Sequence, residues 1–150
     1  MKKNLLSNCY LFRDMTPDEL KKLEPATVAE TFGIADEVFS QGDKATALYI
    51  IKTGSVKIQQ KGSKGKMIEV AKVESGSHFG EMAFLDGERR SAGVEVVERS
   101  EILKIDYKQL RQVLVQNPLM AVKFYRTIAV FLCSRLRATT TDVSFAREKT

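Results

Sequence analysis

The sequence has no apolar run long enough to cross a membrane, and its 150 residues include only two cysteines and one histidine. A transmembrane helix needs about 20 consecutive apolar residues, so we expect no membrane partner. Near the N-terminus, Asn4, Ser7 and Asn8 interrupt the apolar stretch that a signal peptide requires. We therefore expect a cytoplasmic protein in which Cys9 and Cys133 remain reduced thiols.

The shortage of histidine and cysteine also argues against a metal centre or an enzyme. His78 has no cysteine or carboxylate at a spacing typical of metal ligands, so we interpret it as a surface or strand-end residue. Asp86 and Glu88 flank a turn, and only their proximity would support an acid–base pair. We predict no catalytic residues, no metal site and no cofactor.

The positive charge of the chain is concentrated near its C-terminus. The formal net charge is +5, and residues 119–150 hold six basic side chains against two acidic ones, an excess of four. A solvated helix face accounts for this pattern better than a polyanion-binding surface, so we expect no nucleic-acid binding by this chain itself. The contents of 43% hydrophobic and 29% charged residues are ordinary for a soluble domain with a core.

The most informative segment runs from Phe79 to Val96. Gly80 lets the backbone turn or approach a ligand closely. Residues 81–85 suit one helical turn, whose free N–H groups favour an anion. Arg90 offers a planar fork for phosphate oxygens, whereas an ionised Glu81 only accepts hydrogen bonds and suits a sugar hydroxyl. Together these groups predict a site for a phosphorylated sugar.

This segment resembles the phosphate-binding cassette of cyclic nucleotide-binding domains, which occur in the catabolite activator family, in cyclic-nucleotide-dependent kinase regulatory subunits and in gated channels. That cassette reads Phe-Gly-Glu, a small hydrophobic turn, and Arg-Ser/Thr/Ala-Ala before a strand. The positions that match its spacing are Gly80, Glu81, Ala83, Arg90, Ser91 and Ala92. The resemblance implies that Arg90 holds a cyclic phosphate and that Glu81 takes the ribose 2′-hydroxyl. It also implies further hydrogen bonds from Ser91 and from the amides of Met82 and Ala83. The implied ligand is cAMP or cGMP, with the base undecided.

The remaining pattern predicts an α+β fold built on an antiparallel, jelly-roll-like β-roll of about eight strands, with N-terminal helices and a long C-terminal helix. Thr16–Glu19 reads as a capping box, and Pro25 ends that helix. Short strand-like segments separated by turns then follow, at residues 28–32, 37–39, 47–52, 55–60, 67–73, 78–79, 92–97 and 101–105. We expect one domain over residues 1–150, with the roll at about 26–106 and C-terminal helices at about 107–143. Gly42 and Gly54 match glycine turns of the family's roll, so we assign them to backbone geometry.

The pattern of the C-terminal segment predicts that this chain pairs with a second copy of itself. Asn117-Pro118 separates an amphipathic helix from a longer one. Along the longer helix, alternating steps of four and three residues form an a/d seam of Tyr125, Ala129, Leu132, Leu136, Thr139 and Val143. The stripe could pack back on the barrel, as we expect of its first half, or pair with the same helix of another copy. We favour a homodimer through this helix.

Two threonines complete the candidate site. Arg135-Leu136 and the pair Thr139-Thr140 look like the end of the long helix in the catabolite activator family, where a hydroxyl pair reaches the base across the dimer. A fraying helix end is an equal interpretation, because threonine is a mediocre helix former. The predicted function is a cyclic nucleotide sensor that moves its C-terminal helix. Two alternatives stay open: a ligand-free β-roll that serves as a dimerisation or docking module, and the sensor half of a transcription regulator cut before its helix-turn-helix.

Overall fold

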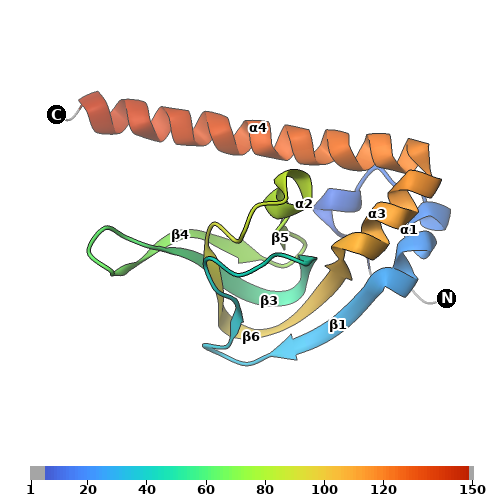
Figure 1. Cartoon of the computed structure of the whole chain (residues 1–150), viewed down its shortest axis with the longest axis horizontal. Coiled ribbons are helices and arrows are strands. Elements are labelled where there is room, and N and C mark those ends of the chain that lie inside the picture. Colours follow the sequence, from blue (N-terminus) through green and yellow to red (C-terminus); the bar gives the residue numbers. More distant parts are fainter. Residues whose placement is uncertain (1–5, 149–150) are drawn as a thin grey trace.

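The computed structural model describes residues 6–148. An antiparallel six-stranded sheet curls into a roll, short helices gather at one end of it, and helix α4 (Pro118–Glu148) runs across the whole molecule (Figure 1). The strands are β1 Thr27–Phe32, β2 Glu37–Phe39, β3 Ala47–Lys61, β4 Met67–Glu74, β5 His78–Phe79 and β6 Gly93–Asp106. The other helices are η1 Tyr10–Phe12, α1 Pro17–Leu23, η2 Glu24–Ala26, α2 Met82–Asp86 and α3 Tyr107–Gln116. The predicted fold class is confirmed.

Two long strands form the spine of the roll. The sheet order is β1-β6-β3-β4, with β2 also pairing with β6 and β5 with β3. The count is six strands where the sequence predicted about eight, because β3 and β6 each continue through a segment that reads as a turn. Within β3 the register with β6 shifts between Ile51 and Val56, so the apparent turn is an irregularity inside one strand.

Gly54 lies at this irregularity because no side chain fits there. Its φ is +102°, and a Cβ atom would lie 2.1 Å from Ser100 Oγ and 2.7 Å from Ser100 Cα. Ser100 is fully buried, and its Oγ accepts a hydrogen bond of 3.1 Å from the Ser55 N–H. The backbone role predicted for Gly54 is therefore confirmed.

The helical end is fastened to the start of α4. The predicted capping box is present: Thr16 Oγ1 accepts from the Glu19 N–H at 3.2 Å, and Glu19 Oε1 accepts from the Thr16 N–H at 2.9 Å. The same Glu19 oxygen lies 2.7 Å from Lys123 Nζ on α4. Phe12 stacks on Phe124 with ring centroids 5.8 Å apart. The first turns of α4 are thus held by both charge and packing.

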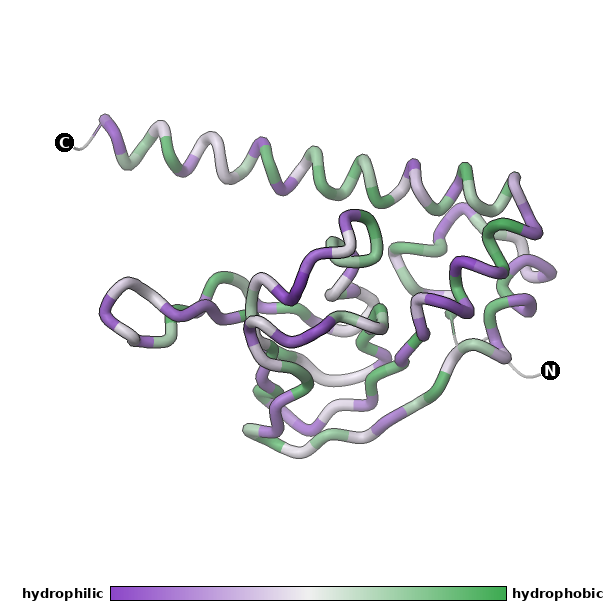
Figure 2. Tube along the Cα trace, in the orientation of Figure 1, coloured by the Kyte–Doolittle hydropathy of each residue, from purple (hydrophilic) through white to green (hydrophobic). Residues whose placement is uncertain are grey.

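The core has two clusters. One fills the roll and includes Tyr49, Ile51, Val56, Phe79, Val96 and Ile102. The other joins the base of the roll to the helices and includes Leu11, Phe12, Leu23, Leu103, Phe124 and Ile128. Burial along α4 ends there, and all residues from 133 to 148 are exposed. Apolar residues nevertheless recur along this far half (Figure 2), which extends five residues beyond the predicted end at Val143.

The cysteines agree with the expectation of free thiols. Cys9 is buried, Cys133 is exposed, and neither forms a disulfide. Burial raises the pKa of the Cys9 thiol to about 11, so the accessible thiol is Cys133. Within residues 6–148, no helix combines the length and apolar character that a bilayer crossing requires.

Candidate ligand-binding site

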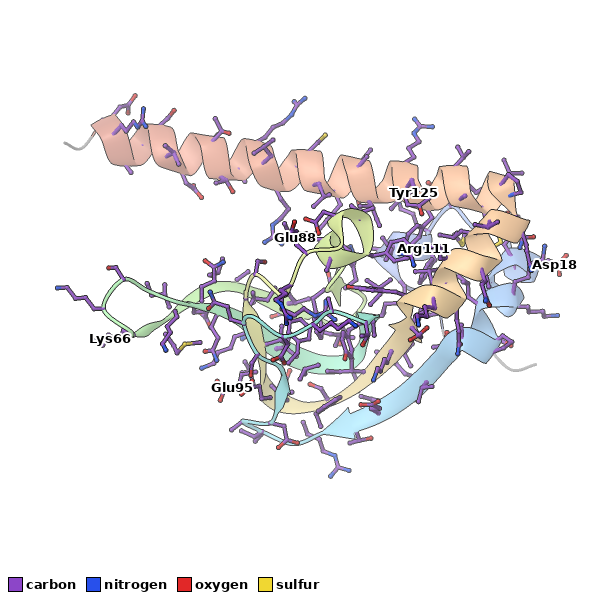
Figure 3. The ribbon with its side chains drawn as sticks, viewed as in Figure 1. Asp18, Lys66, Glu88, Glu95, Arg111 and Tyr125 are labelled. Atoms are coloured by element: carbon purple, nitrogen blue, oxygen red, sulfur yellow. The ribbon has the colours of Figure 1, made fainter. Side chains whose placement is uncertain are left out.

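The cassette forms a tight strand–turn–helix unit. Strand β5 pairs with β3, and Gly80 then turns the chain with a φ of +83°. Glu81 precedes α2, the single short helix that the sequence predicted, and Gly87 ends it in the left-handed conformation. Phe84 of α2 stacks with Tyr125 of α4 at 6.2 Å, so the cassette helix lies directly against α4 (Figure 3).

A cavity of about 600 Å³ lies between the cassette, the roll and α4. Eight of the nine predicted site residues line it: Gly80, Glu81, Met82, Ala83, Arg90, Ser91, Ala92 and Thr139. Thr140 is not among the lining residues, and its hydroxyl donates to the Leu136 carbonyl at 2.9 Å within its own helix. The structure therefore brings the cassette and one of the two threonines together in one cavity.

Arg90 is the buried cation of this cavity and is only 6% exposed. Its Nη2 donates to the Ala47 carbonyl at 2.6 Å, and its Nη1 donates to the Gly80 carbonyl at 3.2 Å and to the Tyr107 hydroxyl at 3.0 Å. The guanidinium carbon lies 4.0 Å from the ring centroid of Phe39. A guanidinium has five N–H donors, and three are used here. Nε has no acceptor among residues 6–148 although it is buried.

Burying this donor without a partner costs free energy, which an incoming anion would recover. The three hydrogen bonds to the protein fix the plane of the guanidinium before a ligand arrives. Arg90 therefore presents a fixed, unpaired N–H beside one remaining hydrogen of Nη2. This is the geometry that a phosphate oxygen pair requires.

Tyr107, the first residue of α3, was not predicted from the sequence and supports Arg90 from outside the cavity lining. Its hydroxyl donates to the Gly80 carbonyl and accepts from Arg90 Nη1. Burial raises the pKa of Tyr107, while the nearby Arg90 charge opposes this shift, so the phenol stays neutral at physiological pH. A sequence signal for this role was available. Tyr107 is an aromatic residue with a hydroxyl, and it begins α3 directly after β6, the strand that follows the cassette.

Glu81 is also buried, at 7% exposed, and its Oε2 lies 3.5 Å from Nδ1 of His78. Sequence patterns predicted a surface or strand-end histidine. His78 does lie at a strand terminus, as the first residue of the two-residue strand β5, but it is not on the surface, because it is 4% exposed and faces a carboxylate. The cause is α4, whose Phe131 covers the imidazole with ring centroids 4.5 Å apart. Within residues 6–148, no group of three or more histidine, cysteine or acidic side chains could hold a metal ion.

The rest of the cavity wall is mostly apolar. The roll contributes Phe39, Ile58, Val70 and Val94, and α4 contributes Phe131, Leu132 and Leu136. Glu88 on the loop after α2 and Arg135 on α4 add charges to the lining (Figure 3 labels Glu88). The cavity thus combines the buried polar groups of Arg90 and Glu81 with a wall that is largely apolar and carries further charges from Asp86, Glu88, Arg89 and Arg135. It suits a ligand with an anionic sugar end and a flat, weakly polar end.

Comparison with known proteins assigns the family. Residues 30–117, more than half of the chain, match the model of the cyclic nucleotide-binding domain. The match contains β2 to β6 in full and the whole cassette. The chain belongs to the cyclic nucleotide-binding domain family.

Individual relatives agree with this assignment. The chain is 38% identical over 78 residues to the cAMP-activated global transcriptional regulator CRP of Haemophilus influenzae, covering 51% of this chain and 35% of that protein. It is 29% identical over 127 residues to the cyclic AMP receptor protein of Thermus thermophilus, covering 85% of this chain and 57% of that protein. The crystal structure of the Thermus thermophilus catabolite activator protein superposes with a TM-score of 0.79 at 27% identity, covering 91% of this chain and 62% of that one. This chain therefore spans less than two thirds of each of these relatives.

Proposed function

We propose that this chain binds a purine 3′,5′-cyclic monophosphate, cAMP or cGMP, and acts as a sensor domain. The observation that carries the proposal is Arg90, a buried guanidinium with an unpaired N–H that lines the cavity. The cyclic phosphate binds Arg90, with further hydrogen bonds from the Ser91 hydroxyl and the amides of Met82 and Ala83. The ribose 2′-hydroxyl donates to Glu81, whose carboxylate lines the same cavity.

The base lies in the apolar part of the cavity and brings α4 into the response. Its neighbours are the α4 residues Phe131, Leu132 and Leu136, and Thr139 offers a hydroxyl. Thr140 contributes from this chain or from a second copy. Because the ligand touches both the cassette and α4, its affinity differs between positions of the helix. That difference is what shifts the helix from one position to another.

Thermal unfolding tests the proposal. At about one hundred times Kd, a ligand stabilises the folded state by about 2.7 kcal/mol, which raises Tm by several degrees for a domain of this size. We expect this shift with cAMP or cGMP and little shift with linear AMP. An absence of shift with all three, in protein free of copurified ligand, would favour the alternative of a ligand-free docking module.

We also propose that α4 pairs with α4 of a second chain. The a/d seam divides in the structure: Leu132 packs on the core, and Thr139 lines the cavity. Ala129, Leu136 and Val143 are exposed at intervals of seven residues, and of these three Leu136 also lines the cavity. Such a repeat places side chains on one outward stripe of the helix. A second copy would cover this stripe, which borders the cavity at Leu136.

Replacing Ala129 by arginine is expected to dissociate this dimer. Two like charges would meet across the two-fold axis, at a cost of several kcal/mol, or on the order of a hundredfold or more in the dimer Kd. Light scattering coupled to size exclusion measures the mass. The control is Ser134→Arg, an equally exposed position about 140° around the helix. A wild-type protein that is monomeric at high micromolar concentration would contradict the pairing.

A further inference from the structure

Three aromatic rings meet behind the cassette carboxylate, each from a different element. Tyr10 comes from η1, His78 from β5 and Phe131 from α4. The centroid distances are 6.1 Å for Tyr10–His78, 5.9 Å for Tyr10–Phe131 and 4.5 Å for His78–Phe131, the last pair in edge contact. The cluster lies where α4 leaves the body of the domain, since the described residues from 133 onward are exposed.

Within the described part of the chain, the two ring nitrogens of His78 lack hydrogen bonds. Neither Nδ1 nor Nε2 has a hydrogen-bond partner among the described residues, and both atoms are buried. A neutral imidazole carries its proton on one of the two nitrogens. The one charged group at ion-pair distance from the ring in the described chain is Glu81, with 3.5 Å between Nδ1 and Oε2. A movement of a few tenths of an ångström turns this contact into a hydrogen bond.

We propose that His78 is a positioning residue that couples the cassette to helix α4. Its Nδ1–H orients the Glu81 carboxylate, and the edge of its ring transmits a displacement of that carboxylate to Phe131. The proposal rests on the function proposed above, in which Glu81 accepts the ribose hydroxyl. The guanidinium carbon of Arg135 lies 5.6 Å from the Phe131 ring centroid and lines the same cavity. Contacts through Glu81, His78 and Phe131 therefore connect the sugar end of the cavity to α4.

Two substitutions separate the two halves of this role. His78→Phe keeps a ring against Phe131 but removes the donor to Glu81. His78→Asn keeps an amide N–H near the position of Nδ1 but removes the ring. Cyclic nucleotide affinity is measured by calorimetry. The movement of α4 is followed with a fluorophore on Cys133, the exposed thiol of α4.

We expect His78→Phe to weaken cyclic nucleotide binding by about tenfold, as for the loss of a hydrogen bond to a charged group. We expect His78→Asn to bind within about threefold of wild type and to lose the ligand-induced fluorescence change. A merely structural histidine would give two variants that differ only in stability. Wild-type affinity and wild-type fluorescence change in both variants would overturn the proposal.

The ligand-free protein gives an independent readout, because the chain has a single histidine. Long-range proton–nitrogen NMR spectra of the full chain without a histidine tag then show one imidazole. We expect the Nδ1–H tautomer, with nitrogen shifts that change in Glu81→Gln. An Nε2–H tautomer whose nitrogen shifts stay the same in Glu81→Gln would refute the His78–Glu81 contact. If wild type binds no cyclic nucleotide, the proposed function fails, and these spectra still decide whether His78 orients Glu81.

Discussion

Replacing Arg90 by alanine is expected to lower the affinity for the cyclic nucleotide by about thirtyfold or more. The phosphate would lose its charged partner in a buried site, and truncating one member of a buried charge pair costs about 2–5 kcal/mol. Isothermal calorimetry measures the loss. Arg90→Lys keeps the charge but not the planar fork, so we expect an intermediate affinity.

The control for this experiment is Arg99→Ala, which removes an exposed arginine of β6 that lies outside the cavity lining. Its affinity should match wild type. Arg90 also holds the Ala47 and Gly80 carbonyls, so each variant needs an unfolding curve to show that it is folded at the assay temperature. An Arg90→Ala protein that is folded and binds as tightly as wild type would remove the central claim.

Replacing Gly54 by alanine is expected to destabilise the fold by about 3 kcal/mol or more, which lowers Tm by roughly 10 °C. The new Cβ would meet Ser100 Oγ at 2.1 Å and its backbone Cα at 2.7 Å, and the φ of +102° is unfavourable for alanine. Because the clash involves a neighbouring strand, β3 and β6 must separate to relieve it. Chemical denaturation gives the change in the free energy of unfolding.

Gly42→Ala is the matched control for the strain alone. Gly42 also has a positive φ, of +90°, but a Cβ atom there would meet nothing within 4 Å. Gly42→Ala should lower the free energy of unfolding by about 1 kcal/mol, the effect of the unfavourable backbone conformation without a clash. Equal losses in the two variants would show that the close approach of Ser100 is not what requires glycine at position 54.

Apart from Thr139, the predicted residues that line the cavity are close together in the chain. Gly80, Glu81 and Arg90 lie within eleven residues, so their spacing fixes a local strand–turn–helix whatever surrounds it. Tyr107 and Phe131 reach the same site from distant elements. Their roles depend on how α3 and α4 pack on the roll, which periodicity does not reveal.

Burial was harder to predict where a helix covers a strand end. His78 follows a turn and precedes a glycine, a context in which an exposed histidine is the ordinary expectation. Phe131 of α4 and Tyr10 of η1, both distant in the sequence, cover it. The strand count differed for a related reason: Gly54 reads as a turn in the sequence, while pairing with β6 keeps β3 continuous. The capping box was predictable because Thr16 and Glu19 satisfy each other locally.

The uneven attachment of α4 would make this helix a lever in the proposed sensor. Its first turns are held by Lys123, Phe124 and Ile128, while all residues from Cys133 to Glu148 are exposed. That free arm is about 23 Å long at 1.5 Å per residue, so a tilt of about 10° at the pivot carries its tip by roughly 4 Å. If α4 moves as proposed, a displacement too small to disturb packing at the cassette would be amplified into one that a neighbouring molecule can detect. In that proposal, the length and stiffness of the helix would determine how far its tip moves for a given tilt, whatever the area of contact with the ligand.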